Sequence, residues 1–251
     1  SRCENVFRTS LHVNAMFGVV GSKLLASLLK YNSSFLKKID ISGNHISGRG
    51  AAAIVSAFRQ NYSLEELNLA NNAIGKEGAI AFARLLNDNI TIKTLNLSWN
   101  NIDSVGGANL AEALRKNQGL RSLNLSGNEL MHDSHSTKGG EQFCGITRFA
   151  EVLRGSGGTN RTLQELNLSD RTCLKMTRSQ AGEFAKCIMD TRCPLINLDL
   201  SKNEIDGPSV DVFLVALGNN KSLCTLNLQF NFLGVEGAGA ICGILDDNNT
   251  L

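Results

Sequence analysis

The residues best suited to chemistry lie in one segment near the middle of the chain. His132, Asp133, His135, Glu141 and Cys144 offer the nitrogen, oxygen and sulfur ligands that zinc accepts in proteins. Their spacing matches no standard zinc site, so we expect no metal and no other cofactor here. The same residues also suit an inserted surface loop, which a solenoid tolerates at little cost.

Two other kinds of catalytic site are considered and rejected. The glycine-rich run at 155–158 lacks the Gly-Lys-Ser/Thr of a phosphate-binding loop and does not lead from a strand into a helix. The cysteines have no identifiable base that would activate a nucleophile, and none of the four histidines stands in a triad context. We therefore expect a protein that is not an enzyme.

The composition is ordinary for a soluble protein and restricts the classes of partner. Hydrophobic residues make up 42% of the chain, and 25 basic against 23 acidic side chains give a net charge of +2. This near-balance does not favour nucleic acid, which is normally met by a concentrated basic surface. No uninterrupted apolar run approaches the ~20 residues that a membrane helix needs, so we expect no membrane segment.

The cysteines favour a reducing compartment. There are seven of them, an odd number, with irregular spacing and no CxxC pair, unlike a secreted domain held together by disulfides. We therefore expect reduced thiols and a cytoplasmic location. Asn-x-Ser/Thr sequons are numerous, but most fall at fixed positions of a repeat, several of them inside expected strands where a glycan would be awkward.

The elements that must position any site come from a repeat of the pattern LxxLxLxxNxL. Its first apolar residue stands at positions 36, 64, 92, 120, 163, 195 and 223, and Leu251 would open another repeat. The successive spacings are 28, 28, 28, 43, 32, 28 and 28 residues. A period this regular predicts a solenoid, in which each unit stacks on its neighbours.

Each part of the repeat has a physical reason. The two leucines of LxL point to one side of a short strand while the residue between them points to the other, so stacked units form a parallel sheet. The asparagine can bond the turning backbone of the neighbouring coils, whose polar groups would otherwise be buried unpaired. The expected ladder consists of Asn44, Asn72, Asn100, Asn128, Asn203 and Asn231.

The second half of each unit predicts a helix. Apolar residues recur every three or four positions in 50–58, 78–86 and 107–114, as one buried helical face requires. The small Gly-Ala pair at the start of each segment lets helix and strand approach closely. Helices are wider than strands, so helices on the outside bend the stack into a horseshoe.

The motif LNLSxNxI followed by GAxxLAxxL, at 28 residues, resembles the ribonuclease-inhibitor-like class of leucine-rich repeats. That class includes the ribonuclease inhibitor, the repeat regions of NOD-like receptors, the Ran GTPase-activating protein and tropomodulin-like actin regulators. The resemblance implies a right-handed α/β horseshoe, with parallel strands on the concave face and helices on the convex face. It also implies recognition of another protein, without choosing among the members of the class.

The domain organisation follows from the repeat positions. We expect a degenerate N-terminal repeat or cap over 1–35, with a helix near 21–30, and seven repeats over 36–251. The last repeat stops in its middle, and terminal repeats normally need a polar cap over their open core. We therefore expect a fragment of a longer array, and other domains of the same full-length chain are further candidate partners.

The expected function is a protein–protein interaction scaffold or recognition module within a larger regulatory or signalling protein. The alternative from a different class is a GTPase-activating protein of the Ran type, and a further alternative is the repeat domain of an actin regulator. Ribonuclease inhibition is disfavoured, because that inhibitor is strongly acidic and cysteine-dense, unlike this slightly basic chain.

The candidate binding surface is the outward side of the strands together with the rim just beyond them. Outward residues are small and polar, so the alternative is that they merely follow the repeat consensus. Trp99 and Phe230 share a position otherwise held by small or polar residues, and exposed aromatics are typical interface anchors, although packing against the next loop is an alternative. The candidate contacts are Lys38, Asp40, Glu66, Asn68, Asn96, Trp99, Asn124, Glu165, Asn167, Arg171, Asp199, Asn227 and Phe230.

The irregular centre of the array is the last candidate. The repeat that starts at 120 is longer than the others, mainly through an insertion over 131–145, and the next repeat has Arg171 in place of the motif asparagine. Insertions in repeat arrays map to loops and often lie on the binding side. A functional protrusion and a tolerated loop explain this segment equally well.

Overall fold

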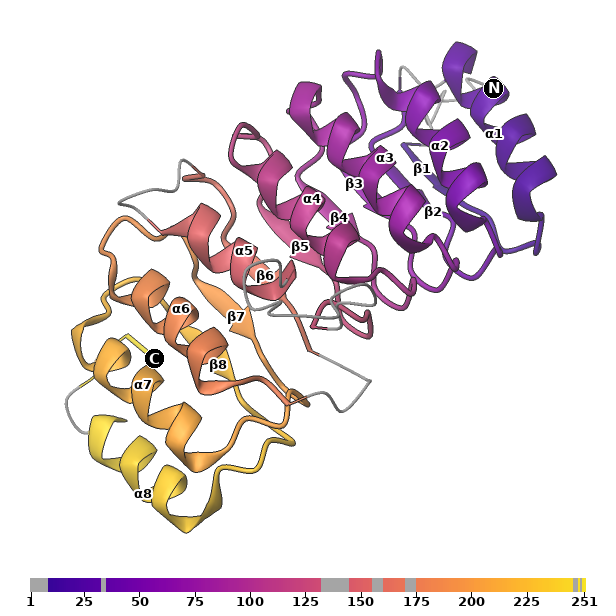
Figure 1. The fold of residues 1–251 in the computed structure, drawn as a ribbon. Coiled ribbons are helices and arrows are strands. Elements are labelled where there is room, and N and C mark those ends of the chain that lie inside the picture. Colours follow the sequence, from indigo (N-terminus) through magenta and orange to yellow (C-terminus); the bar gives the residue numbers. More distant parts are fainter. Residues whose placement is uncertain are drawn as a thin grey trace, which may run out of the picture.

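The computed structural model describes residues 9–32, 35–131, 145–154, 160–169, 175–245, 248 and 250–251. Strands and helices alternate along the chain and form two layers, with the helices side by side in one and the strands in the other (Figure 1). The strands are β1 (Ser10–His12), β2 (Lys38–Asp40), β3 (Glu66–Asn68), β4 (Thr94–Asn96), β5 (Ser122–Asn124), β6 (Glu165–Asn167), β7 (Asn197–Asp199) and β8 (Thr225–Asn227). The helices are α1 (Gly18–Asn32), α2 (Ser47–Phe58), α3 (Gly75–Asp88), α4 (Ser104–Leu114), α5 (Gly145–Leu153), α6 (Arg178–Met189), α7 (Gly207–Asn219) and α8 (Gly234–Leu245).

All the strands belong to one parallel sheet in sequence order, β1 to β8. The predicted α/β solenoid of parallel strands and covering helices is therefore confirmed. The long repeat does not disturb the sheet, because β5 and β6 pair in the same register as the others, with Leu123 opposite Leu166. The extra residues are accommodated outside the strand ladder.

The core lies between the two layers. The motif residues on either side of each outward position, such as Leu67 and Leu69, are buried, as the LxL pattern predicts. From the helix layer, five helices each contribute one fully buried phenylalanine. These side chains are Phe58, Phe82, Phe149, Phe184 and Phe213.

The helices begin three residues earlier than the Gly-Ala pairs suggested: α2, α3 and α4 start at Ser47, Gly75 and Ser104. The glycine of the pair lies in the first turn, where it allows close packing. A Cβ atom on Gly78 would lie 1.9 Å from Cγ2 of Ile74 and 3.1 Å from Cβ of Ala51 in the preceding helix. The small residue therefore permits helix α3 to approach α2 and its own preceding turn, rather than the strand.

The motif asparagines form a buried ladder along the turns that follow the strands. The backbone N–H groups of Asn44, Asn72 and Asn100 donate to the side-chain Oδ1 of the next asparagine, at 2.8, 2.9 and 3.0 Å. Each amide Nδ2 also donates to a carbonyl of the preceding coil, as from Asn72 to Ile41 at 2.9 Å. The ladder thus satisfies polar groups that water cannot reach.

Before the irregular repeats, the ladder runs from Asn44 to Asn128 in the described residues. It resumes where Asn203 N–H donates to Asn231 Oδ1 at 2.9 Å. In the described part of the chain the buried Oδ1 of Asn203 has no hydrogen-bond donor. Arg171, which replaces the asparagine of the preceding repeat, lies outside the described residues.

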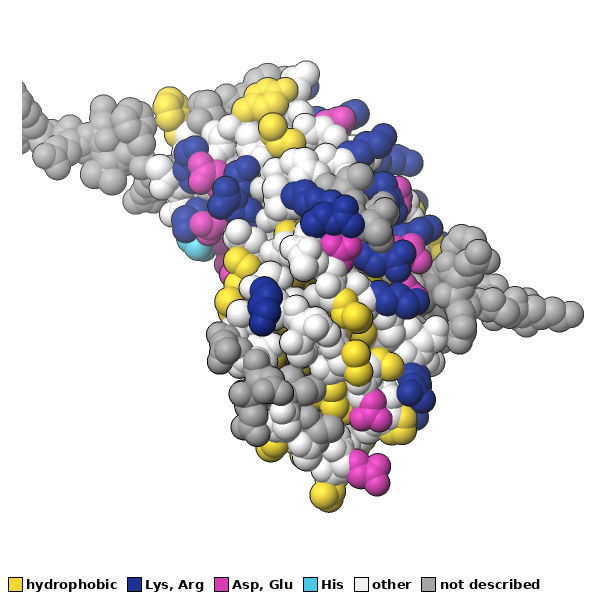
Figure 2. Space-filling view, turned by 90° about the vertical axis from the view of Figure 1, so that its left-hand side faces the viewer, with side chains coloured by type: hydrophobic (Ala, Val, Ile, Leu, Met, Phe, Trp, Pro, Cys, Tyr) yellow, Lys and Arg dark blue, Asp and Glu magenta, His cyan; other side chains and the backbone are white. Residues whose placement is uncertain are grey.

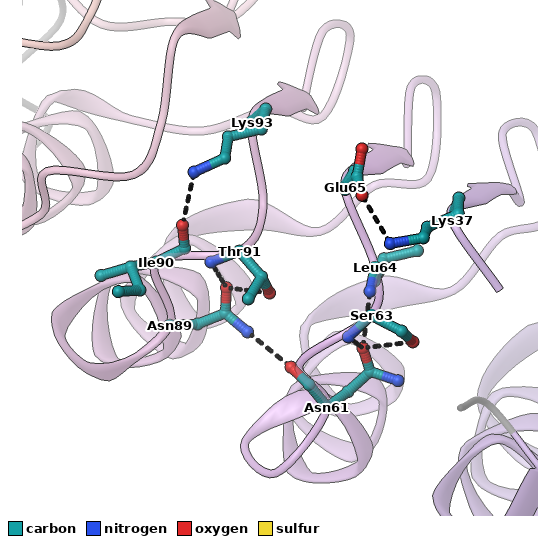
Figure 3. A network of polar contacts seen from close by, with 9 residues as sticks. All are labelled: Lys37, Asn61, Ser63, Leu64, Glu65, Asn89, Ile90, Thr91 and Lys93. Carbon is teal, nitrogen blue, oxygen red and sulfur yellow. Dashed lines mark hydrogen bonds and ion pairs between the residues drawn. The ribbon is translucent and has the colours of Figure 1, made fainter. Parts of the chain in front are cut away.

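A second asparagine ladder runs along the edge where the helices end (Figure 3). Asn89 Nδ2 donates to the carbonyl of Asn61 at 3.1 Å, and Asn117 Nδ2 donates to the carbonyl of Asn89 at 2.8 Å. Each Oδ1 accepts from backbone N–H groups at the start of the next strand segment, such as that of Ile92. Several sequons fall on this ladder, so their amides are buried and already hydrogen-bonded. These are Asn61, Asn89, Asn160, Asn220 and Asn248.

Candidate protein-binding surface

The outward side of the sheet forms one continuous surface, which we call the strand face. In β2 to β7 the middle residue of each strand is buried, and the residues on either side of it point outward. The strand register aligns these outward residues in two rows across the sheet. The candidate contacts that lie on this surface are Lys38, Asp40, Glu66, Asn68, Asn96, Asn124, Glu165, Asn167, Asp199 and Asn227.

The second row consists of Asp or Asn from β2 to β8, and the turn after each strand explains these residue types. Oδ1 of Asn96 accepts a hydrogen bond at 3.0 Å from the backbone N–H of Ser98, two residues further on. The same bond recurs in every strand from β2 to β8, at 2.9 to 3.1 Å. One polar atom of each side chain thus fixes the turn. The second polar atom is engaged by a neighbouring side chain in some strands, as between Asn167 and Asp199.

Charged side chains at the N-terminal end of the strand face are paired with one another. Lys38 Nζ lies 2.7 Å from Glu66 Oε1, and His12 Nδ1 lies 3.8 Å from Asp40 Oδ2. Partial burial raises the pKa of the Asp40 carboxyl, but hydrogen bonds from Ser42 and Asn68 and the nearby His12 outweigh this effect and hold the pKa below its ordinary value. Asp40 is therefore an anionic acceptor at neutral pH.

A shallow groove of about 390 Å³ crosses β5 to β8. Its lining includes the carboxylates of Glu165 and Asp199 and the amides of Asn124 and Asn167. Asn167 Nδ2 donates to Asp199 Oδ2 at 3.3 Å, which orients both side chains. The groove can accept hydrogen bonds from cationic or amide side chains of a partner.

The rim that follows the strands carries the two aromatic candidates, and both have an unusual backbone. Trp99 and Phe230 adopt φ of 58°, in the left-handed region that Gly43 and Gly127 occupy at the same repeat position. Bulky side chains in this region cost of order 1 kcal/mol or more. Trp99 is nevertheless 45% exposed and Phe230 is 75% exposed. These aromatics occupy costly backbone positions without being buried.

Both aromatics have a neighbour on the rim. The Trp99 ring lies so close to Gly127 that a Cβ atom there would be 2.8 Å from the indole. Nζ of Lys202 lies 5.5 Å from the centre of the Phe230 ring, a cation–π distance. The two alternatives for Trp99 are an exposed interface anchor and packing against the next loop. Both apply in part, because the ring packs on the next turn while the residue remains partly exposed.

The remaining sequence candidates lie outside the described residues. These are Arg171, the metal-like residues at 132–144 and most of the inserted segment. Among the residues that the structure describes, no group of three or more His, Cys, Asp and Glu side chains is placed to hold a metal ion. In the same residues, no helix has the length and apolar character needed to cross a membrane.

Sequence reasoning missed a set of cations at the opposite end of the strands. Lys93 and Arg121 directly precede β4 and β5, and Lys116 and Arg161 lie in nearby loops. The balanced overall charge concealed them, and the strand pleat points only to outward strand residues. The 28-residue period could have revealed them, since Lys93 and Arg121 occupy the same repeat position.

Comparisons with known proteins agree with this architecture. A family model described as leucine-rich repeat matches residues 32–55, 60–83, 88–111, 116–134 and 219–242. The unmatched stretch between 134 and 219 contains the irregular repeats, where the structure continues the same alternation through α5, β6, α6, β7 and α7. A search of curated protein sequences found no significant match.

Many solved structures are similar, among them the following three. The leucine-rich repeat-containing protein LegL7 from Legionella pneumophila is 18% identical, with a TM-score of 0.54 over 90% of this chain and 66% of its own. Leiomodin-1 actin-binding site 2 is 16% identical over 89% of this chain and 86% of its own, with a TM-score of 0.39. The tropomodulin C-terminal domain of Caenorhabditis elegans is 13% identical over 90% and 92%, also with a TM-score of 0.39.

The fold assignment depends on the matched repeats, on the strand–helix alternation and on the similarity to the Legionella protein. The asparagine ladder adds the hydrogen-bond pattern expected of the motif. The five matched stretches are leucine-rich repeats, and the chain has the α/β solenoid fold of leucine-rich-repeat proteins.

Proposed function

We propose that this chain is a non-catalytic recognition module that binds another protein through the strand face and the adjoining rim. Leucine-rich repeats are in general an interaction fold, and the strand face supplies an ordered row of amides and carboxylates. The proposal includes a role as a scaffold within a larger regulatory or signalling protein in the cytoplasm. The odd number and irregular spacing of the cysteines support that location, since secreted domains held together by disulfides differ from this pattern.

The observation that carries the proposal is the conformation and exposure of Trp99. A tryptophan is strained in the left-handed backbone, which Asn71 and Gly127 adopt at the same position of the two neighbouring repeats with less strain. Residues held in such regions cluster at ligand-binding sites, where the strain has a use. Tryptophan is also the residue type most enriched among the side chains that dominate protein interfaces.

Affinity capture with three forms of the protein tests the proposal. The forms are the wild type, Trp99→Asn and a variant that lacks residues 131–145. Asparagine tolerates the left-handed backbone and occupies the same repeat position at Asn71, so Trp99→Asn removes the ring without disturbing the turn. We expect the wild type to retain a defined partner that Trp99→Asn retains weakly. Equal capture by all three forms would exclude the rim as the binding surface.

A GTPase assay distinguishes the alternative from the catalytic class. Purified Ran-type GTPase is incubated with GTP in the presence and absence of the chain, and phosphate release is measured. We expect no change in the hydrolysis rate. An acceleration of about a thousandfold or more, typical of a supplied transition-state contact, would replace the recognition module by a GTPase-activating protein.

A further inference from the structure

The edge at which the helices end and the strands begin carries a cluster of cations. Lys93 and Arg121 are adjacent there, because the Arg121 N–H donates to the Lys93 carbonyl at 2.8 Å. Lys116 follows α4, and Arg161 follows α5 and donates its N–H to Gln118 Oε1 at 3.4 Å. We call Lys93, Lys116, Arg121 and Arg161 the basic edge. Figure 2 views this side of the molecule and shows Lys and Arg side chains gathered over its middle.

Nearby carboxylates balance the charge of the basic edge only in part. Arg192 and then Arg161 lower the pKa of Asp190, and Lys37 and then Lys93 lower the pKa of Glu65. Within the described residues, Lys93, Lys116 and Arg121 form no ion pair. Lys93 Nζ instead donates to the Ile90 carbonyl at 2.8 Å (Figure 3). Arg161 Nη1 lies 3.3 Å from the Arg192 carbonyl. Neutral carbonyls satisfy hydrogen bonds without cancelling charge, so the basic edge attracts anions.

Ion pairs limit the basic edge on both sides. Lys37 Nζ lies 2.6 Å from Glu65 Oε1 at one limit, and Arg192 Nε lies 3.2 Å from Asp190 Oδ1 at the other. Hydrogen bonds from Arg192 are the main reason that the pKa of Asp190 lies below its ordinary value, so this carboxylate stays ionised. The positive region therefore spans only a few repeats, and a carboxylate lies at each of its limits, Glu65 at one and Asp190 at the other.

Apolar side chains lie next to these cations. Tyr62 and Ile90, in the loops before β3 and β4, are 75% and 60% exposed. They occupy the same position in successive repeats, and the next two repeats carry Gln118 and Arg161 there. The surface thus passes from apolar to cationic along one row of the solenoid. Interfaces favour this mixture of aromatic residues and arginine.

We propose that the basic edge binds a short acidic segment of a partner protein, with an apolar side chain of that segment against Ile90 and Tyr62. Carboxylates of the segment would meet Lys93, Arg121 and Arg161. Nucleic acid fits less well, because its phosphates continue at every nucleotide and would meet Glu65 and Asp190 at the two limits. This surface lies at the opposite end of the strands from Trp99, so the two surfaces can be tested separately.

Fluorescence anisotropy with a defined probe tests the proposal. The probe is a fluorescein-labelled peptide in which glutamate and leucine alternate, compared with the same peptide carrying glutamine in place of glutamate. We expect saturable binding of the acidic peptide alone, weakening as salt rises because exposed charges are screened. The double charge reversal Lys93→Glu with Arg121→Glu should raise the dissociation constant at least about tenfold. The new carboxylates would repel the glutamates of the peptide.

The matched control changes the net charge equally at another place. Arg49→Glu with Lys76→Glu reverses two cations in the first turns of α2 and α3, at the other end of the helices. Both double variants are first shown by circular dichroism to unfold at temperatures close to the wild type, which excludes misfolding. The control should bind the acidic peptide within about twofold of wild type.

Three results would overturn the proposal. The first is absence of saturable binding of the acidic peptide to the wild type. The second is an equal loss of affinity in the control variant, which would show that net charge alone attracts the peptide. The third is tighter binding of a labelled single-stranded RNA than of the peptide at the same salt concentration, which would assign the basic edge to nucleic acid.

Discussion

The indole of Trp99 lies against the backbone of Gly127, so closely that a Cβ atom on Gly127 would be 2.8 Å from the ring. Gly127 itself adopts φ of 69°, in the left-handed region. The absence of a side chain at Gly127 therefore provides the surface on which Trp99 packs. This contact holds the aromatic ring on the rim without burying it.

The first prediction concerns this pair. Gly127→Ala should destabilise the protein by roughly 1–3 kcal/mol, because alanine is strained at a positive φ and its methyl group displaces the indole. In the Trp99→Asn background the cost should be smaller, since only the backbone strain remains. Urea denaturation of the four proteins measures the coupling between the two positions. Additive costs would show that Trp99 does not rest on Gly127.

A second prediction compares two asparagines of the ladder. Asn100 accepts from the N–H groups of Asn72 and Ile74, and donates from its amide to two carbonyls. Asn203 makes the two donor bonds, but its Oδ1 has no partner in the described residues. Asn100→Ala should therefore lower the free energy of unfolding by roughly 2–4 kcal/mol, because it leaves two buried N–H groups without partners and removes one donor from each of two carbonyls. Asn203→Ala should lower it clearly less, because only the two carbonyls lose a partner. Urea denaturation measures the free energy of unfolding of both variants. Equal losses in the two variants would contradict the role given to the Oδ1 bonds of Asn100.

The third prediction is a pH dependence at the start of α7. Lys175 Nζ lies 2.6 Å from the Asp206 carboxylate, and Ser209 N–H donates to Asp206 at 2.9 Å. The bond from Lys175, followed by those from Ser209, lowers the pKa of Asp206 to about 2. A lowered pKa stabilises the fold above the unfolded value near ~3.9, and this stabilisation is lost as the pH falls towards 2.

Asp206→Ala should accordingly lower the free energy of unfolding by about 1 kcal/mol at pH 6, as loss of a helix cap does. The loss should become progressively smaller as the pH falls from 4 to about 2.5. Chemical denaturation at a series of pH values measures the difference. Asp206→Asn is the control, because it keeps the cap and removes the charge. A penalty for Asp206→Ala that does not change with pH would contradict the stated role of the charge.

The fourth prediction concerns thiol reactivity. Cys187 and Cys193 are buried with their Sγ atoms 3.2 Å apart, and the hydrogen bond to Cys193 together with burial raises the pKa of Cys187. Cys224 and Cys242 are exposed. Because the thiolate is the reactive form and must be accessible, iodoacetamide at pH 7 should label Cys224 and Cys242 before Cys187 and Cys193. Mass spectrometry of the peptides identifies the sites, and early labelling of Cys187 would show that the turn after α6 opens.

Much of the fold could be predicted from the sequence, because the repeat combines two periodicities. The LxL pattern placed the strands, and the apolar periodicity placed the helices to within three residues at their starts. The error arose because the Gly-Ala pair marks the point of closest helix packing, at Gly78 for example, and not the first helical residue. Segments without a repeated pattern, such as 131–145, offered no comparable information.

The candidate site was predictable only in part. Aligning the repeats placed Trp99, like Phe230, in a position otherwise held by Gly43, Asn71, Gly127, Asp170 and Lys202. Glycine and asparagine tolerate the left-handed backbone that Trp99 also adopts. Its contact with Gly127 depends on the spacing between coils, which a one-dimensional pattern does not contain. The basic edge was missed for a similar reason, since loops from separate repeats bring Arg121 and Arg161 onto one surface.

The most direct test of the central claim is the affinity of a purified partner for Trp99→Asn and for Val215→Asn. Val215 is the matched control because, like Trp99, it is an exposed apolar residue. It lies in α7, in the helix layer, and not on the rim. Isothermal titration should show at least about tenfold weaker binding for Trp99→Asn and wild-type affinity for Val215→Asn. Wild-type affinity for Trp99→Asn, or weaker binding for Val215→Asn alone, would contradict recognition through the strand face and its rim.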